Sequence, residues 1–226
     1  MKIAVLGTGT VGRTLAAKLS ELGHDVVVGT RDPQATLDRT EPDAMGNPPF
    51  AAWQAGHPPV RLSSFAQAAA PAELVVNATG GESSLDALTR AGAENLAGKV
   101  LLDVSNPLDF SQGRPPSLFV KDTDSLAEQI QRAFPEARVV KALNTMTAAV
   151  MVDPGRVGGG DHSVFVSGND AEAKQTIVSL LRDFGHTDVI DLGDLSTARG
   201  AEMYVPLWLR LMGSVGTPFF NIKVVR

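Results

Sequence analysis

The sequence predicts an α/β fold with a doubly wound, mostly parallel Rossmann sheet and a C-terminal helical segment. Three observations predict it. Short apolar runs alternate with helix-like runs along most of the chain, which is typical of βαβ units. Several of these runs, such as IAVL and VVV, are continuously apolar, as expected for strands that helices cover on both faces. A glycine-rich stretch follows directly after the first run, Lys2–Leu6.

The individual elements follow from this alternation. Strands are expected at Lys2–Leu6, Asp25–Gly29, Leu74–Ala78, Val100–Val104, Arg138–Ala142, Ser163–Ser167 and Val189–Leu192. Helices are expected at Thr10–Leu22, Ser63–Ala69, Ser83–Ala91, Ser125–Phe134 and Ala171–Phe184. Several of these helices open on Ser, Thr or Asp, which are favoured as N-caps.

Three segments depart from this pattern. The proline-rich stretch Asp32–Leu62 is an insertion, either a lid or a surface loop, with a short helix expected around Phe50–Gln54. Gly158–Gly160 is more typical of a surface loop than of a lid. In residues 193–226, Pro206 must bend or restart a helix, and a short extended apolar tail follows. We expect this tail to cover one end of the sheet or a dimer partner.

The composition is that of an ordinary globular enzyme. The chain has 226 residues, of which 43% are apolar and 20% charged, and its net charge is −5. A chain of this length buries one substantial core, and the absence of a basic stripe argues against nucleic acid as a partner. The sequence has no cysteine, which excludes disulfides, thiolate metal sites and a cysteine nucleophile.

No stretch of the sequence has the pattern of a targeting or membrane segment. The opening run MKIAVLGTG is too short for a signal peptide and breaks at glycines. Val205–Val215 is shorter than the ~20 residues of a membrane span and contains Arg210, so we interpret it as a packed helix. We therefore expect a cytoplasmic protein with no membrane partner.

The glycine-rich stretch predicts a dinucleotide site. Strand, glycines and helix arrive in the order that a phosphate-binding loop requires, which strengthens an otherwise weak GxGxxG pattern. The first glycine permits the tight turn, the second lets a pyrophosphate approach the backbone, and the third lets the helix pack on the strand. Free N–H groups at the helix start face the phosphate charge. The residues concerned are Gly7, Thr8, Gly9, Thr10, Val11 and Gly12.

The end of the second strand predicts a preference for NADP. An NAD site places Asp or Glu about 20 residues after the glycines, where it binds the ribose hydroxyls. Here the chain has Thr30 followed by Arg31. A hydroxyl donor and a permanently charged, planar guanidinium suit the 2′-phosphate of NADP, which a carboxylate would repel. Asp32 could pair with Arg31, but its place at a helix start favours a cap.

Small polar residues follow three further strands. Ligands of doubly wound sheets lie beyond the carboxyl ends of the strands, so these residues are candidates for contacts with the ribose and nicotinamide. For each asparagine alone, a turn or cap role is nearly as good an interpretation. The predicted contacts are Ala78, Thr79 and Gly80 after the third expected strand, Ser105, Asn106 and Pro107 after the fourth, and Asn144 and Thr145 after the fifth.

No general acid or base stands out in the sequence, so the catalytic residues stay unassigned. The histidines His24, His57, His162 and His186 are scattered without the spacing of a metal site, and we expect no metal. Asp103 lies within an expected strand and is interpreted as a structural carboxylate. Hydride transfer between two cofactors fits this pattern, because it depends on ring stacking and exclusion of water more than on proton transfer.

Nearly the whole chain resembles the NADP oxidoreductases that depend on the deazaflavin coenzyme F420. The resemblance runs through GTGTVGRTLAAKLSELGHDVVVGTRDP, LLDVSNPL, ARVVKALNTMTAAVM, VFVSGNDAEAK and DLGDLSTARGAEMYVPLWLRLM. The pair VVKALNT and VFVSGND is the most discriminating part. It is also similar to the cytosolic NADPH-binding domain of the six-transmembrane metalloreductases, which pass hydride to FAD.

The resemblance implies a small reductase in which the nicotinamide stacks on a flavin-type ring near Asn144 and Thr145. It also implies a homodimer whose C-terminal segment helps to form the second pocket. This sequence departs from the family in having Asn144 where a histidine is usual, GTGTVG where GGTGNLG is usual, and the long insertion Asp32–Leu62. These departures concern the electron acceptor rather than NADP.

We therefore predict an NADP(H)-dependent oxidoreductase that transfers hydride between NADPH and a flavin or deazaflavin, with F420, FMN or FAD as the partner. Residues 1–192 would form the NADP-binding domain, and residues 193–226 a helical segment at the acceptor pocket or a dimer contact. Two alternatives stay open. One is reduction of a small carbonyl or imine, which requires a general acid such as Tyr204. The other is a non-catalytic NADP(H) sensor.

Overall fold

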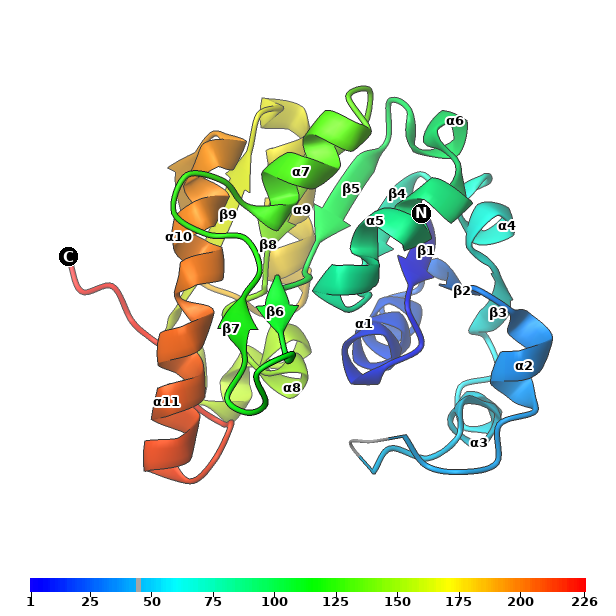
Figure 1. Ribbon diagram of the computed structural model, residues 1–226, viewed down its shortest axis with the longest axis horizontal. Coiled ribbons are helices and arrows are strands. Elements are labelled where there is room, and N and C mark those ends of the chain that lie inside the picture. The colour runs from blue at the N-terminus through cyan, green and yellow to red at the C-terminus, as the bar shows by residue number, and fades with distance from the viewer. Residues whose placement is uncertain (44–45) are drawn as a thin grey trace.

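The computed structural model describes residues 1–43 and 46–226 as one eight-stranded sheet, covered on both faces by helices, and a separate two-stranded hairpin (Figure 1). The strands are β1 (Lys2–Leu6), β2 (Asp25–Thr30), β3 (Arg61–Ser64), β4 (Leu74–Asn77), β5 (Val100–Asp103), β6 (Leu108–Asp109), β7 (Ser117–Leu118), β8 (Arg138–Ala142), β9 (Ser163–Gly168) and β10 (Asp188–Gly193). The helices are α1 (Thr10–Glu21), α2 (Pro33–Leu37), α3 (Phe50–Ala55), α4 (Phe65–Ala69), α5 (Gly81–Ala91), α6 (Ala93–Leu96), α7 (Leu126–Ala133), α8 (Ala148–Val152), α9 (Ala171–Asp183), α10 (Ala198–Met203) and α11 (Val205–Val215).

The strand order of the sheet is β10-β9-β8-β5-β4-β1-β2-β3. Neighbouring strands are parallel except β8 and β9, where Val140 pairs with Gly168 in antiparallel register. The order reverses between β1 and β4, which is the switch point where doubly wound sheets bind ligands. The predicted α/β class and the mostly parallel sheet are confirmed.

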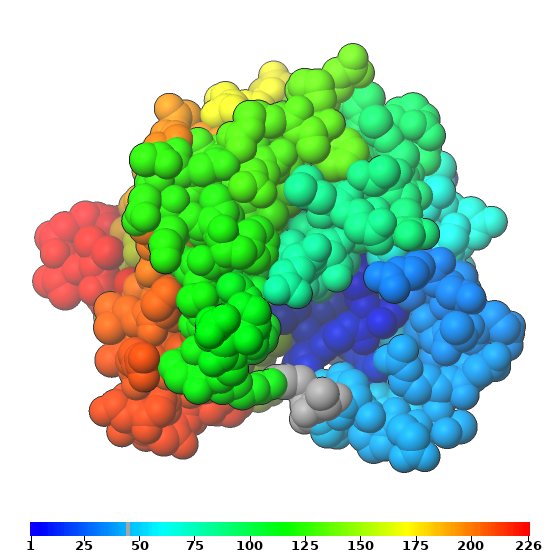
Figure 2. Space-filling view, in the orientation of Figure 1, coloured from blue at the N-terminus to red at the C-terminus, as the bar shows by residue number. Residues whose placement is uncertain are grey.

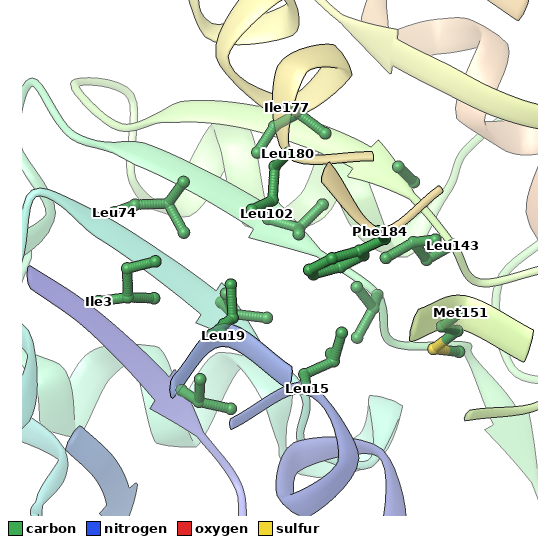
Figure 3. Close-up of a cluster of buried hydrophobic side chains, with 14 of the residues drawn as sticks. Ile3, Leu15, Leu19, Leu74, Leu102, Leu143, Met151, Ile177, Leu180 and Phe184 are labelled. Atoms are coloured by element: carbon green, nitrogen blue, oxygen red, sulfur yellow. The ribbon is translucent and has the colours of Figure 1, made fainter. Parts of the chain in front are cut away.

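Side-chain alternation along the strands divides the core between the two faces of the sheet. Ile3 and Val5 of β1 pack on one face with α1, α3, α8 and α9, whereas Ala4 and Leu6 pack on the other face with α4, α5, α6, α7 and α10. Figure 3 shows part of the first cluster, where Leu15 and Leu19 of α1 approach the sheet. Because both faces are covered, most positions of the central strands carry apolar residues.

Two boundary signals in the sequence act as expected. The Asp32 carboxylate accepts a hydrogen bond from the Ala35 backbone N–H at 3.0 Å and so caps α2. Pro206 lies in the first turn of α11, where the chain restarts after α10, and a proline is tolerated there because its missing N–H has no helical partner. No helix in residues 1–43 or 46–226 is both long and apolar enough to cross a membrane.

The structure corrects the expected elements at two places. Residues Arg61–Ser64 form the edge strand β3, so the helix expected from Ser63 begins at Phe65. The hairpin of β6 and β7 was not expected at all. Gly158–Gly160 is a short 3-10 turn next to another at Pro154–Arg156, which fits the expected surface loop.

The C-terminal tail lies against the first residues of β9 and β10. The backbone N–H of Ser163 donates to Ile222 O at 2.9 Å, and Lys223 and Arg226 both pair with the Asp188 carboxylate. These contacts hold the pKa of Asp188 at about 2, with the Ser163 hydroxyl as the largest cause. Of the two expectations for the tail, coverage of one end of the sheet is the one that this chain displays.

Two of the four histidines meet beneath this tail. The rings of His162 and His186 lie edge to face with centroids 6.0 Å apart. The Nε2 of His186 is 2.9 Å from Met151 O, and because a carbonyl only accepts, Nε2 carries the proton. Its Nδ1 is buried and has no hydrogen-bond partner in the described part of the chain. Burial lowers the pKa of His186 below 6.5.

We expect the free energy of unfolding to decrease as the pH is lowered from 7.5 to 5.5. Below about 6.5 the unfolded chain protonates His186 while the folded chain does not, so stability present at neutral pH is lost as the pH falls toward the folded pKa. Urea unfolding at both pH values checks this. His186→Gln should reduce the difference between them, and an unchanged difference would assign the effect to other groups.

Candidate NADP-binding site

Two glycines of the phosphate loop, Gly7 and Gly12, lie where no side chain fits. A Cβ on Gly12 would lie 2.1 Å from Gly7 O, and one on Gly7, whose φ is +121°, would lie 2.6 Å from Ala78 O. Turn, helix and strand end are therefore in direct backbone contact. A Cβ on Gly9 would meet nothing within 4 Å, so the backbone there faces open space at the start of α1. A loop of this shape fits a pyrophosphate.

Two cavities meet beside this loop, over the carboxyl ends of the strands. The larger, of about 430 Å³, lies toward β2, and the smaller, of about 250 Å³, lies toward β5. They share Ala78, Thr79, Gly80 and Ser83, so together they form one continuous cleft. Figure 2 shows the molecular surface hollowed between the N-terminal segments, in blue, and the hairpin segment, in green.

The predicted residues divide between the two cavities. The larger is lined by Gly7, Thr8, Gly9, Thr30, Arg31, Ala78, Thr79 and Gly80, and the smaller by Val11, Ala78, Thr79, Gly80, Ser105 and Asn106. Five predicted contacts lie outside both linings, namely Thr10, Gly12, Pro107, Asn144 and Thr145. Gly12 acts through backbone packing, as described above.

The larger cavity carries the positive charge expected for a 2′-phosphate. Arg31 is exposed at its wall, and Asp32 does not neutralise it by hydrogen bonding because that carboxylate caps α2. A second exposed guanidinium, Arg39, lines the same cavity. The sequence reasoning missed Arg39. The start signal Asp32-Pro33 indicates a short helix, and a short helix there would return the chain toward the phosphate loop and bring Arg39 to the site.

Thr30 contributes differently from the expectation. Its hydroxyl lies 2.9 Å from the Thr36 hydroxyl, which donates to Asp32 O at 2.7 Å. The Thr36 proton is therefore engaged, and the Thr30 hydroxyl donates to Thr36 in this chain of hydrogen bonds. Thr30 lines the cavity and supports the start of α2, while the two arginines present the exposed donors.

The insertion is anchored to the phosphate loop. The buried Arg13 guanidinium donates to Thr8 O and to Pro48 O, and it lies 5.4 Å from the centre of the Phe50 ring. Burial lowers the pKa of Arg13, while the Asp43 carboxylate opposes that shift. Asn47 donates to the Thr10 hydroxyl at 2.7 Å. The expected helix near Phe50 is present as α3, and the insertion borders the site, whereas Met45 and Ala44 lie outside the described residues.

Behind the smaller cavity lies a buried ionic network. Lys141 of β8, 1% exposed, pairs at 2.8 Å with both Asp103 of β5 and Glu202 of α10. Burial lowers the pKa of Lys141, but attraction by the two carboxylates outweighs it and raises that pKa. Glu202 also accepts from the N–H groups of Leu126 and Ala127 at the start of α7. The network therefore joins the sheet to two helices.

Asp103 is engaged as a structural carboxylate, as expected. It accepts hydrogen bonds from Ser105 Oγ at 2.6 Å and from Asn77 Nδ2 at 2.9 Å, in addition to Lys141. Ser105 lines the smaller cavity and hydrogen-bonds Asp103, so the ionic network lies directly behind Ser105. The sequence reasoning missed Lys141 and Glu202. A lysine inside the apolar strand RVVKA was the available signal, because a buried cation needs carboxylate partners.

The two predicted asparagines form a reciprocal pair. Asn106 Nδ2 donates to Asn144 O, and Asn144 Nδ2 donates to Asn106 Oδ1, both at 3.0 Å. Asn144 also donates to Ala201 O of α10. Asn106 thus reaches the cavity, while Asn144 is buried and holds it in place.

Tyr204, the general acid that a carbonyl reductase would need, does not line either cavity. Its hydroxyl is buried and has no hydrogen-bond partner among the residues described, and burial raises the pKa of the phenol. Among the residues that the structure describes, Glu82 is the one carboxylate at the wall of the smaller cavity. Glu82 is exposed in the first turn of α5, where a negative charge favours the helix dipole.

Comparison with known proteins identifies the family of this chain. The sequence profile described as "NADP oxidoreductase coenzyme F420-dependent" matches residues 2–107. A solved structure from Arthrobacter sp. FB24, provisionally named an F420-dependent NADP-reductase, is 65% identical, covers all of both chains and has a TM-score of 0.96. The chain belongs to the F420-dependent NADP oxidoreductase family. This confirms the predicted resemblance and the predicted class, an NADP-dependent oxidoreductase.

Three further proteins resemble the chain at lower identity. The F420-dependent NADP reductase of Methanocaldococcus jannaschii is 28% identical over 213 residues, which are 93% of this chain and 92% of that protein. Metalloreductase STEAP3 of Rattus norvegicus is 33% identical over 220 residues, and this chain spans only 38% of its length. A reductive aminase from Aspergillus terreus in complex with NADPH, 16% identical with a TM-score of 0.60, shares the fold.

Proposed function

We propose that the protein transfers hydride between NADPH and a flavin or deazaflavin acceptor. The observation that carries this proposal is the continuous cleft, in which the cavity lined by Arg31 and Arg39 joins a cavity lined by amide, hydroxyl and apolar groups. The first suits the adenosine half of NADPH with its 2′-phosphate. The second suits the nicotinamide and a second ring stacked on it.

The residues present fit these roles. When bound, NADPH supplies a hydride; one hydride and one proton reduce a flavin-type ring, and NADP⁺ leaves. The backbone at Gly9 and the start of α1 would hold the pyrophosphate, and Asn106 would hydrogen-bond the nicotinamide carboxamide from its fixed place beside Asn144. The proton can come from solvent, so the scarcity of acids and bases around the smaller cavity is consistent with this reaction.

A screen of acceptors tests the proposal. NADPH oxidation should be observed with at least one of FMN, FAD or F420, and NADH should be a much poorer donor. Tyr204→Phe and Glu82→Gln should leave the rate with that acceptor nearly unchanged, since neither group is needed to move a proton. Turnover of carbonyl compounds but not flavins would overturn the proposal, as would NADP binding without turnover of any acceptor.

The C-terminal segment is proposed as a dimer contact. Both cavities are lined by residues between Gly7 and Phe110, so residues 193–226 contribute nothing to them in the same chain. The outer face of α11 exposes Leu207 and Val215, each 55% accessible. Exposed apolar residues on one face favour association with a second copy. Light scattering should give the mass of a homodimer, and Leu207→Glu should shift it toward the monomer.

A further inference from the structure

We propose that Phe110 and Arg114, on the β6–β7 hairpin, form a clamp for the electron acceptor: the ring contacts the planar face of the acceptor, and the guanidinium binds its anionic tail. This inference rests on the proposed function and assigns the residues of this chain that would hold the acceptor's ring and its charged tail. Neither residue was expected to contribute to the site.

The hairpin is fixed to the smaller cavity at its base. The backbone N–H of Leu108 donates to Asn106 O at 2.8 Å, and that of Phe119 donates to Pro107 O at 3.0 Å. A Cβ on Gly81 would lie 2.1 Å from Asn106 O, so the first turn of α5 packs directly on this base. Because Asn106 also pairs with Asn144, the hairpin is attached to the same groups that face the nicotinamide position.

Phe110 lines the smaller cavity and is nevertheless 47% exposed. An aromatic ring at the wall of a cavity offers a face on which a second flat ring can stack. The hairpin segment borders the hollow that Figure 2 shows. Leu108 and Val104 line the cavity beside Phe110, so this end of the cleft is more apolar than the end at Arg31.

The charge beside this ring is placed for an anion. The guanidinium carbon of Arg114 lies over the Phe110 ring, 5.5 Å from its centre, so it covers one face of that ring and a stacked acceptor would use the other face. None of the ion pairs found within residues 1–43 and 46–226 involves Arg114. A permanently charged planar group beside an aromatic ring suits a phosphate or carboxylate on a molecule stacked there. Arg114 belongs to neither cavity lining and reaches the smaller cavity only through its contact with Phe110. Arg31 and Arg39 line the larger cavity and are assigned to the 2′-phosphate, so Arg114 is a separate cationic position.

The test compares Phe110→Ala and Arg114→Ala with Phe119→Ala, which removes a similarly exposed aromatic ring outside the cavity lining. Three acceptors differ in their tails: riboflavin is uncharged, while FMN and FAD carry phosphates. Phe110→Ala should raise KM for all three about tenfold. Arg114→Ala should raise KM for FMN about threefold at low salt and leave riboflavin unchanged. Phe119→Ala should change none of them, and KM for NADPH should stay constant throughout.

Direct binding separates this inference from the proposed function. The protein with NADP⁺ bound should quench the fluorescence of an added flavin, and this quenching measures the affinity for the acceptor whether or not turnover occurs. The affinity should decrease in the same variants. A wild-type enzyme that reduces no acceptor refutes the proposed function alone. The clamp is refuted if Phe110→Ala matches Phe119→Ala, if Arg114→Ala affects riboflavin and FMN equally, or if Phe110→Ala changes only the oligomeric mass, which would make the hairpin an interface.

Discussion

Lys141→Met is expected to destabilise the protein by about 3–5 kcal/mol, because it leaves Asp103 and Glu202 buried without their cation. For a chain of this size the Tm should fall by roughly 10 °C or more. Urea unfolding and thermal denaturation at pH 7 measure the loss. Lys121→Met is the matched control, because that lysine is exposed, and its effect should stay within about 0.5 kcal/mol.

A second substitution set shows whether charge or packing causes this loss. Combining Lys141→Met with Asp103→Asn and Glu202→Gln removes all three charges, so part of the stability should return. A single Lys141→Met variant as stable as the control would mean that the two carboxylates take up protons at little cost, and the network would then not hold α10 on the sheet.

Arg31→Glu is expected to lower kcat/KM for NADPH about 100-fold, because a charged hydrogen-bonding partner of the phosphate is replaced by a repelling carboxylate. Activity with NADH should not fall, since NADH has no 2′-phosphate. Steady-state rates with both nucleotides measure the change in preference. The combined variant Arg31→Glu with Arg39→Ala should lose more than either single variant, because both guanidiniums line the cavity.

Arg61→Ala is the control for this experiment. Arg61 begins the neighbouring strand β3, but it pairs with Asp25 and lines neither of the two cavities of the site. Its loss should leave the nucleotide preference unchanged. An Arg31→Glu variant with the NADPH affinity of the parent protein would contradict the assignment of this end of the cleft.

Local sequence signals were sufficient to predict the part of the fold that holds the cofactor. Continuous apolar runs located β1, β2, β4 and β5 to within a residue or two, because each strand is buried on both faces. The glycine pattern at positions 7, 9 and 12 predicted a tight turn with close backbone packing. In the structure, a Cβ added to Gly7 or Gly12 would lie less than 3 Å from a backbone oxygen. These features depend on neighbours in sequence, so a single chain reveals them.

Features that depend on distant residues could not be predicted in this way. Strand β9 is antiparallel to β8, so residues 143–162 begin and end at the same end of the sheet. A connection of this length would also suit a crossover to a parallel strand, so its length does not reveal the direction of β9. The strands of the hairpin have two residues each, too few for a periodic pattern. Lys141 pairs with Glu202, which lies 61 positions later in the sequence. Asn144 hydrogen-bonds Asn106 and does not itself line the cleft.

The bond between Glu202 and Lys141 has a consequence for how the enzyme moves. Swinging α10 away from the sheet would separate the Glu202 carboxylate from Lys141 and would release two amides of α7, while Lys141 would keep Asp103. Loss of these contacts would be costly, so we expect the C-terminal segment to stay closed on the sheet. We therefore expect substrate and product to exchange at the rim of the cleft, where Arg39 and Arg114 are exposed.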